Sequence, residues 1–205
     1  MINILLDLDQ TCISAESLEG DDAEFSYKNP EQLRKMQKYR SEDMDGYYLV
    51  FERPGLQEFL DYLFKNFNVC VWTAASKDYA LFIIKEFIIN GKKDRKLDWA
   101  FFSYHCKISE RIKNDRSKNL KLLWEDFELP GFNSGNTYIL DDNPEVYETQ
   151  PDKCIISPPF EFKDRKSYKD KFLYFLKKRL QESGKNIDVH KLNSEIRDSF
   201  EVDSE

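Results

Sequence analysis

The sequence predicts an α/β protein with a doubly wound, mostly parallel sheet. Short apolar runs alternate along the chain with longer segments whose apolar residues recur at helical spacing, and three of the short runs end in acidic or hydroxyl residues. Strands that alternate with helices form right-handed βαβ units, which build a parallel sheet with helices on both faces. Such sheets bind ligands at the carboxyl ends of their strands, so these three positions are candidate site positions.

The apolar runs and stripes place the individual elements. Residues 2–8 contain five large aliphatic side chains without alternation, which is typical of a strand buried on both faces. The predicted strands are 2–6, 48–51, 69–72, 99–103, 137–140 and 153–156. The predicted helices are 56–64, 76–91, 119–127 and 168–180, each with one apolar stripe. Ser76 is the expected N-cap of the second helix, and Gly91 marks its end.

Two aspartates follow the first predicted strand. Asp7 and Asp9 are two residues apart, so in an extended chain their side chains project to the same side. Two carboxylates this close repel each other unless a cation lies between them or one binds a proton. The pair therefore predicts a divalent metal ion, a perturbed acid or both, and the alternative is a polar exit from the strand without chemistry.

Residues 14–47 interrupt the pattern with an acidic piece followed by a basic, helical-looking piece. We interpret them as an insert that is too short to bury its own core, either a substrate-facing flap or a solvated surface loop. The simplest organisation is a single domain over residues 1–183. Residues 184–205 form a polar C-terminal tail with one short docked helix around Val189, Leu192 and Ile196, and the last residues are expected to fray.

Two further strand ends carry candidate groups. The strand ending at Thr73 leads into a helix whose free backbone N–H groups could bind a phosphate, or Thr73 is only a hydroxyl at a strand end. The strand over 137–140 ends in Asp141 and Asp142, which repeats the opening pattern of an apolar run followed by carboxylates.

A basic stretch lies between these two strands, with a polar loop expected over residues 104–117. It could attract an anionic substrate or be a solvated face. Its cations are Lys92, Lys93, Arg95, Lys96, Lys107, Arg111, Lys113 and Arg116.

Composition narrows the functional class. The formal net charge of −7 argues against a protein that coats nucleic acid. The four cysteines form no Cys-x-x-Cys pair, which favours buried free thiols in a reducing compartment over disulfides or a zinc site. We find no signal peptide and no apolar run of membrane-spanning length, and we expect a soluble, intracellular protein in the nucleus or cytoplasm.

The order of the candidate groups resembles the four motifs of the haloacid dehalogenase superfamily of phosphohydrolases. More narrowly, it resembles the FCP/SCP group of protein serine/threonine phosphatases over residues 3–180. The matching segments are Asp7-Leu8-Asp9-Gln10-Thr11, Arg53-Pro54-Gly55, Val71-Trp72-Thr73-Ala74-Ala75-Ser76, His105-Cys106, Lys118-Asn119-Leu120 and Asp141-Asp142-Asn143-Pro144. The resemblance implies a phosphatase fold of that superfamily and a phosphoprotein substrate such as the C-terminal domain of RNA polymerase II.

The resemblance also implies a role for each site residue. Asp7 would be the nucleophile that forms an aspartyl-phosphate, and Asp9 would be the general acid and base. Thr73, Ala74 and Lys118 would bind the phosphoryl oxygens. The Mg²⁺ ligands would be Asp7, the backbone carbonyl of Asp9, Asp141, and Asp142 through a water molecule.

The predicted function is a Mg²⁺-dependent phosphoprotein phosphatase, and two alternatives stay open. The gaps at 14–47 and 104–117 are too short for the large cap of metabolite phosphatases, so the site is expected to be capless and open to a macromolecule. One alternative is a capless phosphatase for nucleic-acid ends or small phosphate esters, motivated by the basic stretch. The other is a non-catalytic scaffold that binds phosphopeptides. No membrane partner is expected, and a nucleic-acid partner is disfavoured.

Overall fold

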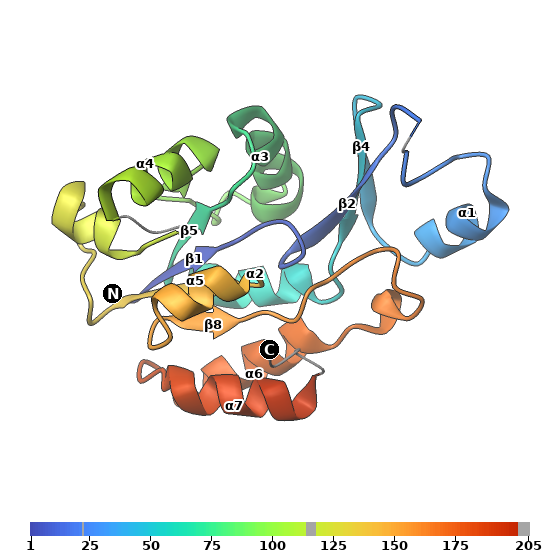
Figure 1. Cartoon of the computed structure of the whole chain (residues 1–205). Helices are drawn as coiled ribbons and strands as arrows, with labels where there is room; N and C mark the ends of the chain where they lie inside the picture. Colours follow the sequence, from blue (N-terminus) through green and yellow to red (C-terminus); the bar gives the residue numbers. More distant parts are fainter. Residues whose placement is uncertain (22, 114–117, 201–205) are drawn as a thin grey trace.

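The computed structural model describes residues 1–21, 23–113 and 118–200 (Figure 1). The strands are β1 (Asn3–Leu6), β2 (Ile13–Ser17), β3 (Ser41–Met44), β4 (Tyr48–Glu52), β5 (Asn68–Trp72), β6 (Ala100–Phe101), β7 (Thr137–Asp141) and β8 (Cys154–Ile156). The α-helices are α1 (Pro30–Met36), α2 (Leu56–Asn66), α3 (Lys77–Ile83), α4 (Ser103–Lys113), α5 (Pro144–Thr149), α6 (Phe172–Ser183) and α7 (Val189–Ser199). Two π-helical segments, η1 (Ile84–Ile89) and η2 (Leu122–Asp126), and a 3₁₀ turn, η3 (Ser167–Lys169), complete the set.

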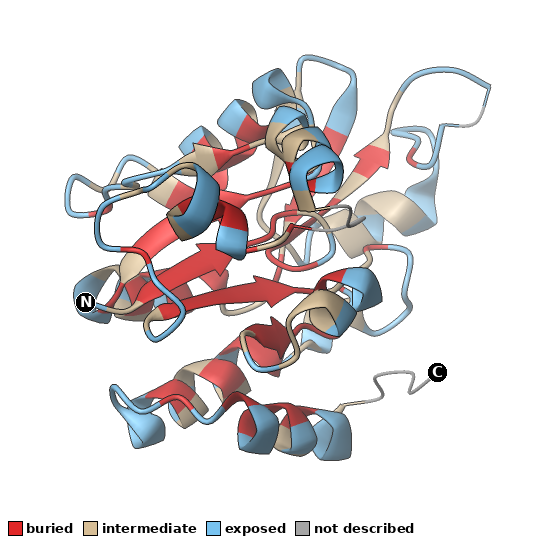
Figure 2. Ribbon diagram, turned by 60° about the vertical axis from the view of Figure 1, so that its left-hand side comes forward, coloured by how far each residue is buried: buried red, intermediate tan, exposed pale blue. Residues whose placement is uncertain are grey.

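The main sheet has five parallel strands in the order β6-β5-β1-β7-β8. Its central strand β1 is buried on both faces, and Figure 2 shows the buried strands between layers of helices. Ile4 and Leu6 pack on one face with α2, α6 and α7, whereas Leu5 packs on the other with η2 and α5. The predicted doubly wound α/β fold is therefore confirmed.

A second, smaller sheet lies beside the main one, and its strands are antiparallel in the order β2-β4-β3. The predicted insert supplies most of β2 and all of β3 and α1, so residues 14–47 are not a simple surface loop, and the substrate-facing flap stays a prediction. Phe25 of the insert packs with Leu49 and Phe51 of β4 and with the distant Phe162. The apolar cluster of the insert therefore depends on residues outside it, in β4 and at Phe162.

One other expectation was wrong, and one helix was not predicted. Residues 103–113 form helix α4 rather than a polar loop, and residues 114–117, with the expected Arg116, lie outside the described residues. Only Ser109 of α4 is fully buried, so the helix lacks the apolar stripe that would have marked it in the sequence. Helix α5 was not predicted, although Asn143 caps it and Pro144 opens it.

The C-terminal part of the chain packs against the main sheet. Val189, Leu192 and Ile196 of α7 join the same apolar cluster as β1, and Asn193 donates to the carbonyl of Cys154 at 2.8 Å. Residues 201–205, which were expected to fray, lie outside the described residues. All four cysteines are free thiols. In the described part of the chain, no helix is both long and apolar enough to cross a membrane.

Candidate active site

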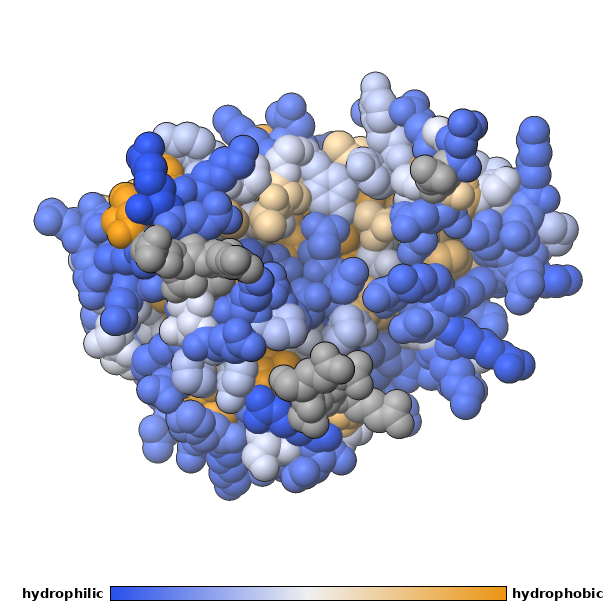
Figure 3. Space-filling model, viewed as in Figure 1, coloured by the Kyte–Doolittle hydropathy of each residue, from blue (hydrophilic) through white to orange (hydrophobic). Residues whose placement is uncertain are grey.

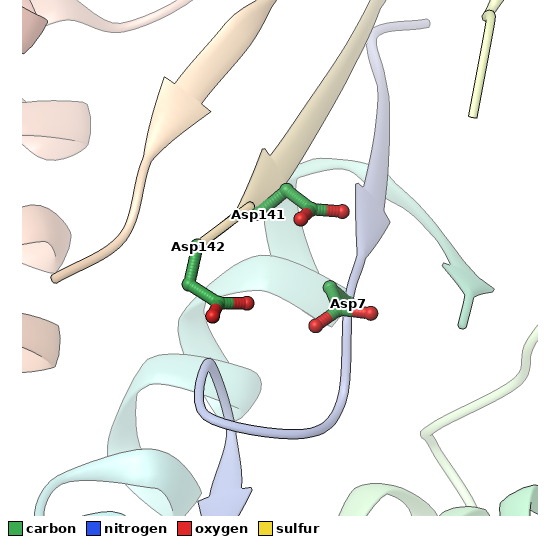
Figure 4. A group of neighbouring side chains, drawn as sticks. All are labelled: Asp7, Asp141 and Asp142. Atoms are coloured by element: carbon green, nitrogen blue, oxygen red, sulfur yellow. The ribbon is translucent and has the colours of Figure 1, made fainter. Parts of the chain in front are cut away.

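Three carboxylates converge at the carboxyl ends of β1 and β7. Leu6 pairs with Leu140 in the sheet, so the next residues, Asp7 and Asp141, leave the two strands side by side. Figure 4 shows the side chains of Asp7, Asp141 and Asp142 directed into one space. One oxygen from each lies within 4.8 Å of the others, and Thr11 donates a hydrogen bond of 3.2 Å to Asp142. The register of the parallel sheet thus assembles the acidic cluster.

Lys118 is buried within this cluster. Its Nζ lies 2.5 Å from Oδ1 of Asp7 and 2.7 Å from Oδ2 of Asp141. Gln150 fixes the backbone around it, because its amide donates to the Lys118 carbonyl at 2.7 Å and accepts from the N–H of Leu120 at 2.9 Å. Contacts to both the side chain and the backbone of Lys118 therefore fix its position.

The charges of this cluster are unbalanced. Asp7, Asp141 and Asp142 together carry three negative charges against the single positive charge of Lys118. Burial raises the pKa of Asp7 to about 6 and that of Asp141 to about 6, despite the nearby ammonium group. Burial opposes the charge of Lys118, but the two carboxylates outweigh it and raise the pKa of Lys118 above its usual value. A divalent cation with a preference for oxygen ligands fits this donor set and its residual charge.

Asp9 lies at the start of the loop that leaves β1. The hydroxyl of Tyr79, in α3, donates a hydrogen bond of 2.5 Å to Oδ1 of Asp9. Burial raises the pKa of Asp9, and the Tyr79 hydrogen bond partly offsets that rise. The loop turns sharply at Gln10, whose φ is 58°, and the N–H of Cys12 returns to the carbonyl of Leu8 at 2.8 Å. This turn reverses the chain between β1 and β2 just after Asp9.

Arg53 holds the loop that follows Asp9 through a hydrogen bond to its backbone. Its guanidinium is fully buried and donates to the Thr11 carbonyl at 3.1 Å, to Ser157 at 2.9 Å and to both oxygens of Asp170. It also lies over the ring of Phe172, 4.6 Å from the centroid. One buried arginine therefore ties the loop after Asp9 to two distant segments.

Thr73 and Ala74 follow β5, the strand on the other side of β1. Thr73 is buried, and its hydroxyl accepts from the N–H of Ala75 at 3.1 Å, which leaves the hydroxyl hydrogen available to a ligand. Ala74 is exposed, and its N–H forms no hydrogen bond with the described residues. Ser76 occupies the N-cap position of α3 as predicted, but its side chain makes no capping bond. These donors suit the oxygens of an anion.

Three cations of the basic stretch, Lys92, Arg95 and Lys113, form structural ion pairs. Lys92 and Arg95 both bind Asp61, and the buried Arg95 guanidinium also donates to the Ile88 carbonyl at 2.7 Å. Lys113 pairs with Glu125 and Asp126. These three cations therefore hold the fold together rather than face a substrate.

A comparison with protein families identifies this arrangement. The model of the NLI interacting factor-like phosphatase family matches residues 2–190. The chain belongs to this family. It is a phosphatase of the FCP/SCP type within the haloacid dehalogenase superfamily.

Two viral proteins are similar to this chain over most of their length. The 355R protein of Invertebrate iridescent virus 6, described as CTD phosphatase-like, is 44% identical over 86% of this chain and 96% of its own. The 355R protein of Invertebrate iridescent virus 3, with the same description, is 41% identical over 87% of this chain and 94% of its own.

Two solved structures share the fold. The fission yeast RNA polymerase II CTD phosphatase Fcp1, bound to beryllium fluoride, matches with a TM-score of 0.54 and 18% identity over 96% of this chain. A second structure of Fcp1, an essential RNA polymerase II CTD phosphatase, matches with a TM-score of 0.51 and 18% identity over 100% of this chain. The chain spans 62% and 54% of the two Fcp1 chains, so these likenesses concern the fold alone.

Sequence reasoning brought out the ionisable groups of this NLI interacting factor-like phosphatase but missed three residues that hold them. Tyr79 was placed in an apolar stripe, Gln150 was not considered, and Arg53 was noted only as part of a motif. The partners of Tyr79 and Gln150 lie 70 and 32 residues away, and no local pattern signals such contacts. For Arg53, an arginine directly before Pro-Gly and between two apolar segments was a usable signal.

Proposed function

We propose that the chain is a Mg²⁺-dependent phosphoprotein phosphatase that acts on phosphoserine or phosphothreonine through an aspartyl-phosphate at Asp7. The observation that carries the proposal is the position of Asp7 at the carboxyl end of β1, 2.5 Å from Lys118 and beside two further carboxylates. Asp9, two residues later, is held separately by Tyr79. This difference in environment supports a role in attack for Asp7 and a role in proton transfer for Asp9.

The proposed reaction has two steps. In the first, an oxygen of Asp7 attacks phosphorus, the bond between phosphorus and the serine oxygen breaks, and Asp9 gives its proton to that oxygen. In the second, Asp9 takes a proton from water, the water oxygen attacks phosphorus, and the bond to Asp7 breaks to release phosphate. In both steps Lys118, Thr73 and the N–H of Ala74 bind the phosphoryl oxygens and stabilise their charge.

The proposed metal ligands are Asp7, the backbone carbonyl of Asp9, Asp141, and Asp142 through water. When bound, Mg²⁺ would screen the repulsion between the Asp7 carboxylate and the phosphate dianion. The residual negative charge of the cluster, with three carboxylates against one lysine, supports this assignment.

The proposed substrate is a phosphorylated side chain on a protein. Asp9 is only half-buried and Ala74 is exposed, so the site is accessible from solvent. The relatives are described as CTD phosphatase-like, and Fcp1 as an RNA polymerase II CTD phosphatase, which makes that phosphorylated domain the first candidate substrate.

Hydrolysis of para-nitrophenyl phosphate in Mg²⁺ and in EDTA tests the proposal. We expect turnover that requires Mg²⁺ and is lost in Asp7→Asn, while the control Asp152→Asn, at an exposed aspartate, retains it. Phosphoserine peptides are then compared with a 3′-phosphorylated oligonucleotide. Faster turnover of the oligonucleotide would overturn the substrate class, and absence of turnover in the folded, metal-loaded protein would overturn the enzymatic proposal in favour of a phosphopeptide-binding role.

A further inference from the structure

A cavity of about 840 Å³ lies outside the candidate active site, between α1 and the segment 162–168. Five cations line it: Arg34, Lys35, Lys38, Lys163 and Arg165. This is an unusual concentration in a chain whose formal net charge is −7. Figure 3 shows mainly hydrophilic side chains over the α1 end of the molecule, on the right of the view.

Three of these cations form no direct ion pair within the described part of the chain. Among the described residues, no carboxylate forms an ion pair with Arg34, Lys38 or Arg165, and all three side chains are exposed. Lys38 lies over the ring of Tyr168, 4.0 Å from its centroid, which fixes its direction. Two guanidinium groups and an oriented ammonium therefore line the same cavity without a direct ion pair to a carboxylate of the described residues.

The remaining two cations form the wall of the cavity. Lys35 donates to the backbone carbonyls of Phe162 and Asp164, so it joins α1 to the segment 162–168. Lys163 pairs with Glu161. The cavity is thus closed on one side by a direct link between its two basic segments.

Carboxylates also line the cavity and limit what can enter it. Glu16 is buried and accepts from Ser14, and Glu24 accepts from the N–H of Ser17. Glu31 lies in the first turn of α1. A long polyanion such as a nucleic acid would meet these negative charges along its length, whereas a single phosphoryl group is small enough to pair with an arginine without extending along them.

The cavity is connected to the loop that follows Asp9. The N–H of Phe160 donates to the Gln10 carbonyl at 2.7 Å, and that of Phe162 donates to the Ser14 hydroxyl at 2.9 Å. Glu16, which lines the cavity, follows Asp9 by seven residues. Fully extended, that stretch spans at most about 25 Å, so an extended peptide of about eight residues or fewer can reach from one site to the other.

We infer that this basic cavity, made by Arg34, Lys38 and Arg165 around the wall of Lys35 and Lys163, binds a second phosphoryl group on the same protein substrate. The inference rests on the proposed phosphoprotein phosphatase function. A second phosphate site makes the enzyme selective for multiply phosphorylated segments, because arginine pairs with a phosphate dianion through charge-assisted hydrogen bonds. The phosphate in the cavity is bound and not hydrolysed.

The test uses phosphoserine peptides and two triple variants. One peptide carries a single phosphoserine, and a series adds a second phosphoserine at each position from two to eight residues away on either side. The cavity variant is Arg34→Ala with Lys38→Ala and Arg165→Ala. The control variant, Lys65→Ala with Lys178→Ala and Lys185→Ala, removes the same charge from exposed positions elsewhere. Peptide binding is measured by fluorescence anisotropy in an Asp7→Asn background, and turnover is measured with Asp7 intact.

We expect at least one doubly phosphorylated peptide to bind about tenfold more tightly than the single one, a difference of about 1.4 kcal/mol. The cavity variant should lose this preference, the control variant should keep it, and both should hydrolyse para-nitrophenyl phosphate like the unmodified protein. Equal binding of single and double phosphopeptides, or a preference that survives in the cavity variant, would overturn the inference.

The two proposals fail separately in this experiment. Turnover of phosphopeptides without any preference for doubly phosphorylated peptides would support the proposed function and contradict the second phosphate site. Tighter binding of doubly phosphorylated peptides that depends on the three cations, without any turnover, would support the phosphate site in the cavity and contradict the enzymatic function.

Discussion

The ammonium nitrogen of Lys118 lies 2.5 Å from an oxygen of Asp7, with both side chains buried. The same nitrogen lies 2.7 Å from Asp141, so one cation compensates two carboxylates that have little access to water. Removal of a single partner from such a cluster leaves uncompensated charge in a region of low dielectric. The stability of the site and its chemistry therefore depend on the same contact.

The first prediction concerns Lys118→Met. We expect the free energy of unfolding in EDTA at neutral pH to fall by about 3 kcal/mol, because two buried carboxylates lose their cation. Turnover should fall by roughly 10²-fold or more. Urea denaturation and para-nitrophenyl phosphate assays measure the two effects. Lys113→Met is the control, since its pairs with Glu125 and Asp126 lie near the surface and should be worth about 1 kcal/mol or less. Equal effects of the two variants would contradict the account.

Tyr79→Phe tests the support of Asp9. The variant keeps the ring but removes the hydroxyl that donates to Asp9. We expect turnover of a phosphoserine peptide to fall by about tenfold, with a smaller loss on para-nitrophenyl phosphate, whose leaving group needs little help from an acid. Tyr48→Phe is the matched control, because the Tyr48 ring contacts that of Tyr79 at 5.4 Å between centroids. A loss that is the same for both substrates would show that Tyr79 does not act through proton transfer.

Arg53→Met tests the loop that carries Asp9. The substitution retains apolar volume beside Phe172 but removes the guanidinium that donates to the Thr11 carbonyl and pairs with Asp170. We expect a loss of about 3 kcal/mol in the free energy of unfolding, measured by urea denaturation. Arg197→Met, at an exposed arginine over the ring of Tyr147, should cost less than about 1 kcal/mol. If Arg53→Met is as stable as this control, the arginine does not anchor the loop.

A pH-dependent prediction follows from His105. Its Nδ1 accepts a hydrogen bond of 2.9 Å from the N–H of Phe102, at the start of α4, in the manner of a capping box. Burial lowers the pKa of His105, and only the neutral ring can accept this bond. A folded-state pKa below that of the unfolded chain means that the stability His105 contributes is present at neutral pH and above. That stability is lost as the pH falls through the folded-state pKa.

We therefore expect His105→Gln, which can still accept the bond, to lose less stability than the unmodified protein between pH 7.5 and pH 5. Thermal unfolding at the two pH values measures the difference. Parallel losses in both proteins would mean that His105 stays protonated or unbonded in the folded state.

Much of the main sheet was predictable because its strands are buried on both faces. The runs that became β1, β5 and β7 are short, apolar and followed by the groups that the site uses. In the small sheet, β4 was predicted as the strand 48–51, but β2 and β3 were missed for the opposite reason. β3 reads Ser-Glu-Asp-Met, and its stability comes from pairing with β4 rather than from an apolar pattern of its own.

The helices show the same division. α2 has a clear apolar stripe and was predicted, whereas α4 buries almost nothing and was interpreted as a loop. α5 carried local signals in Asn143 and Pro144, but these residues were interpreted only as part of a motif. For the site, the sheet register brings Asp7 and Asp141 together, and this follows from the predicted strands. The contacts of Tyr79 with Asp9 and of Gln150 with Lys118 depend on packing between distant segments, which a single sequence does not encode in any local pattern.

The central claim is that Asp7 receives the phosphoryl group, and chemical trapping tests it most directly. A phosphoserine peptide is mixed with the Mg²⁺-loaded protein, the reaction is quenched in acid during turnover, and the product is reduced with borohydride, which converts an aspartyl-phosphate to homoserine. Peptide mass mapping then locates the modified residue. The account predicts homoserine at position 7 that requires both substrate and Mg²⁺. Substrate-dependent modification at Asp9 or elsewhere, or turnover without any modified aspartate, would contradict it.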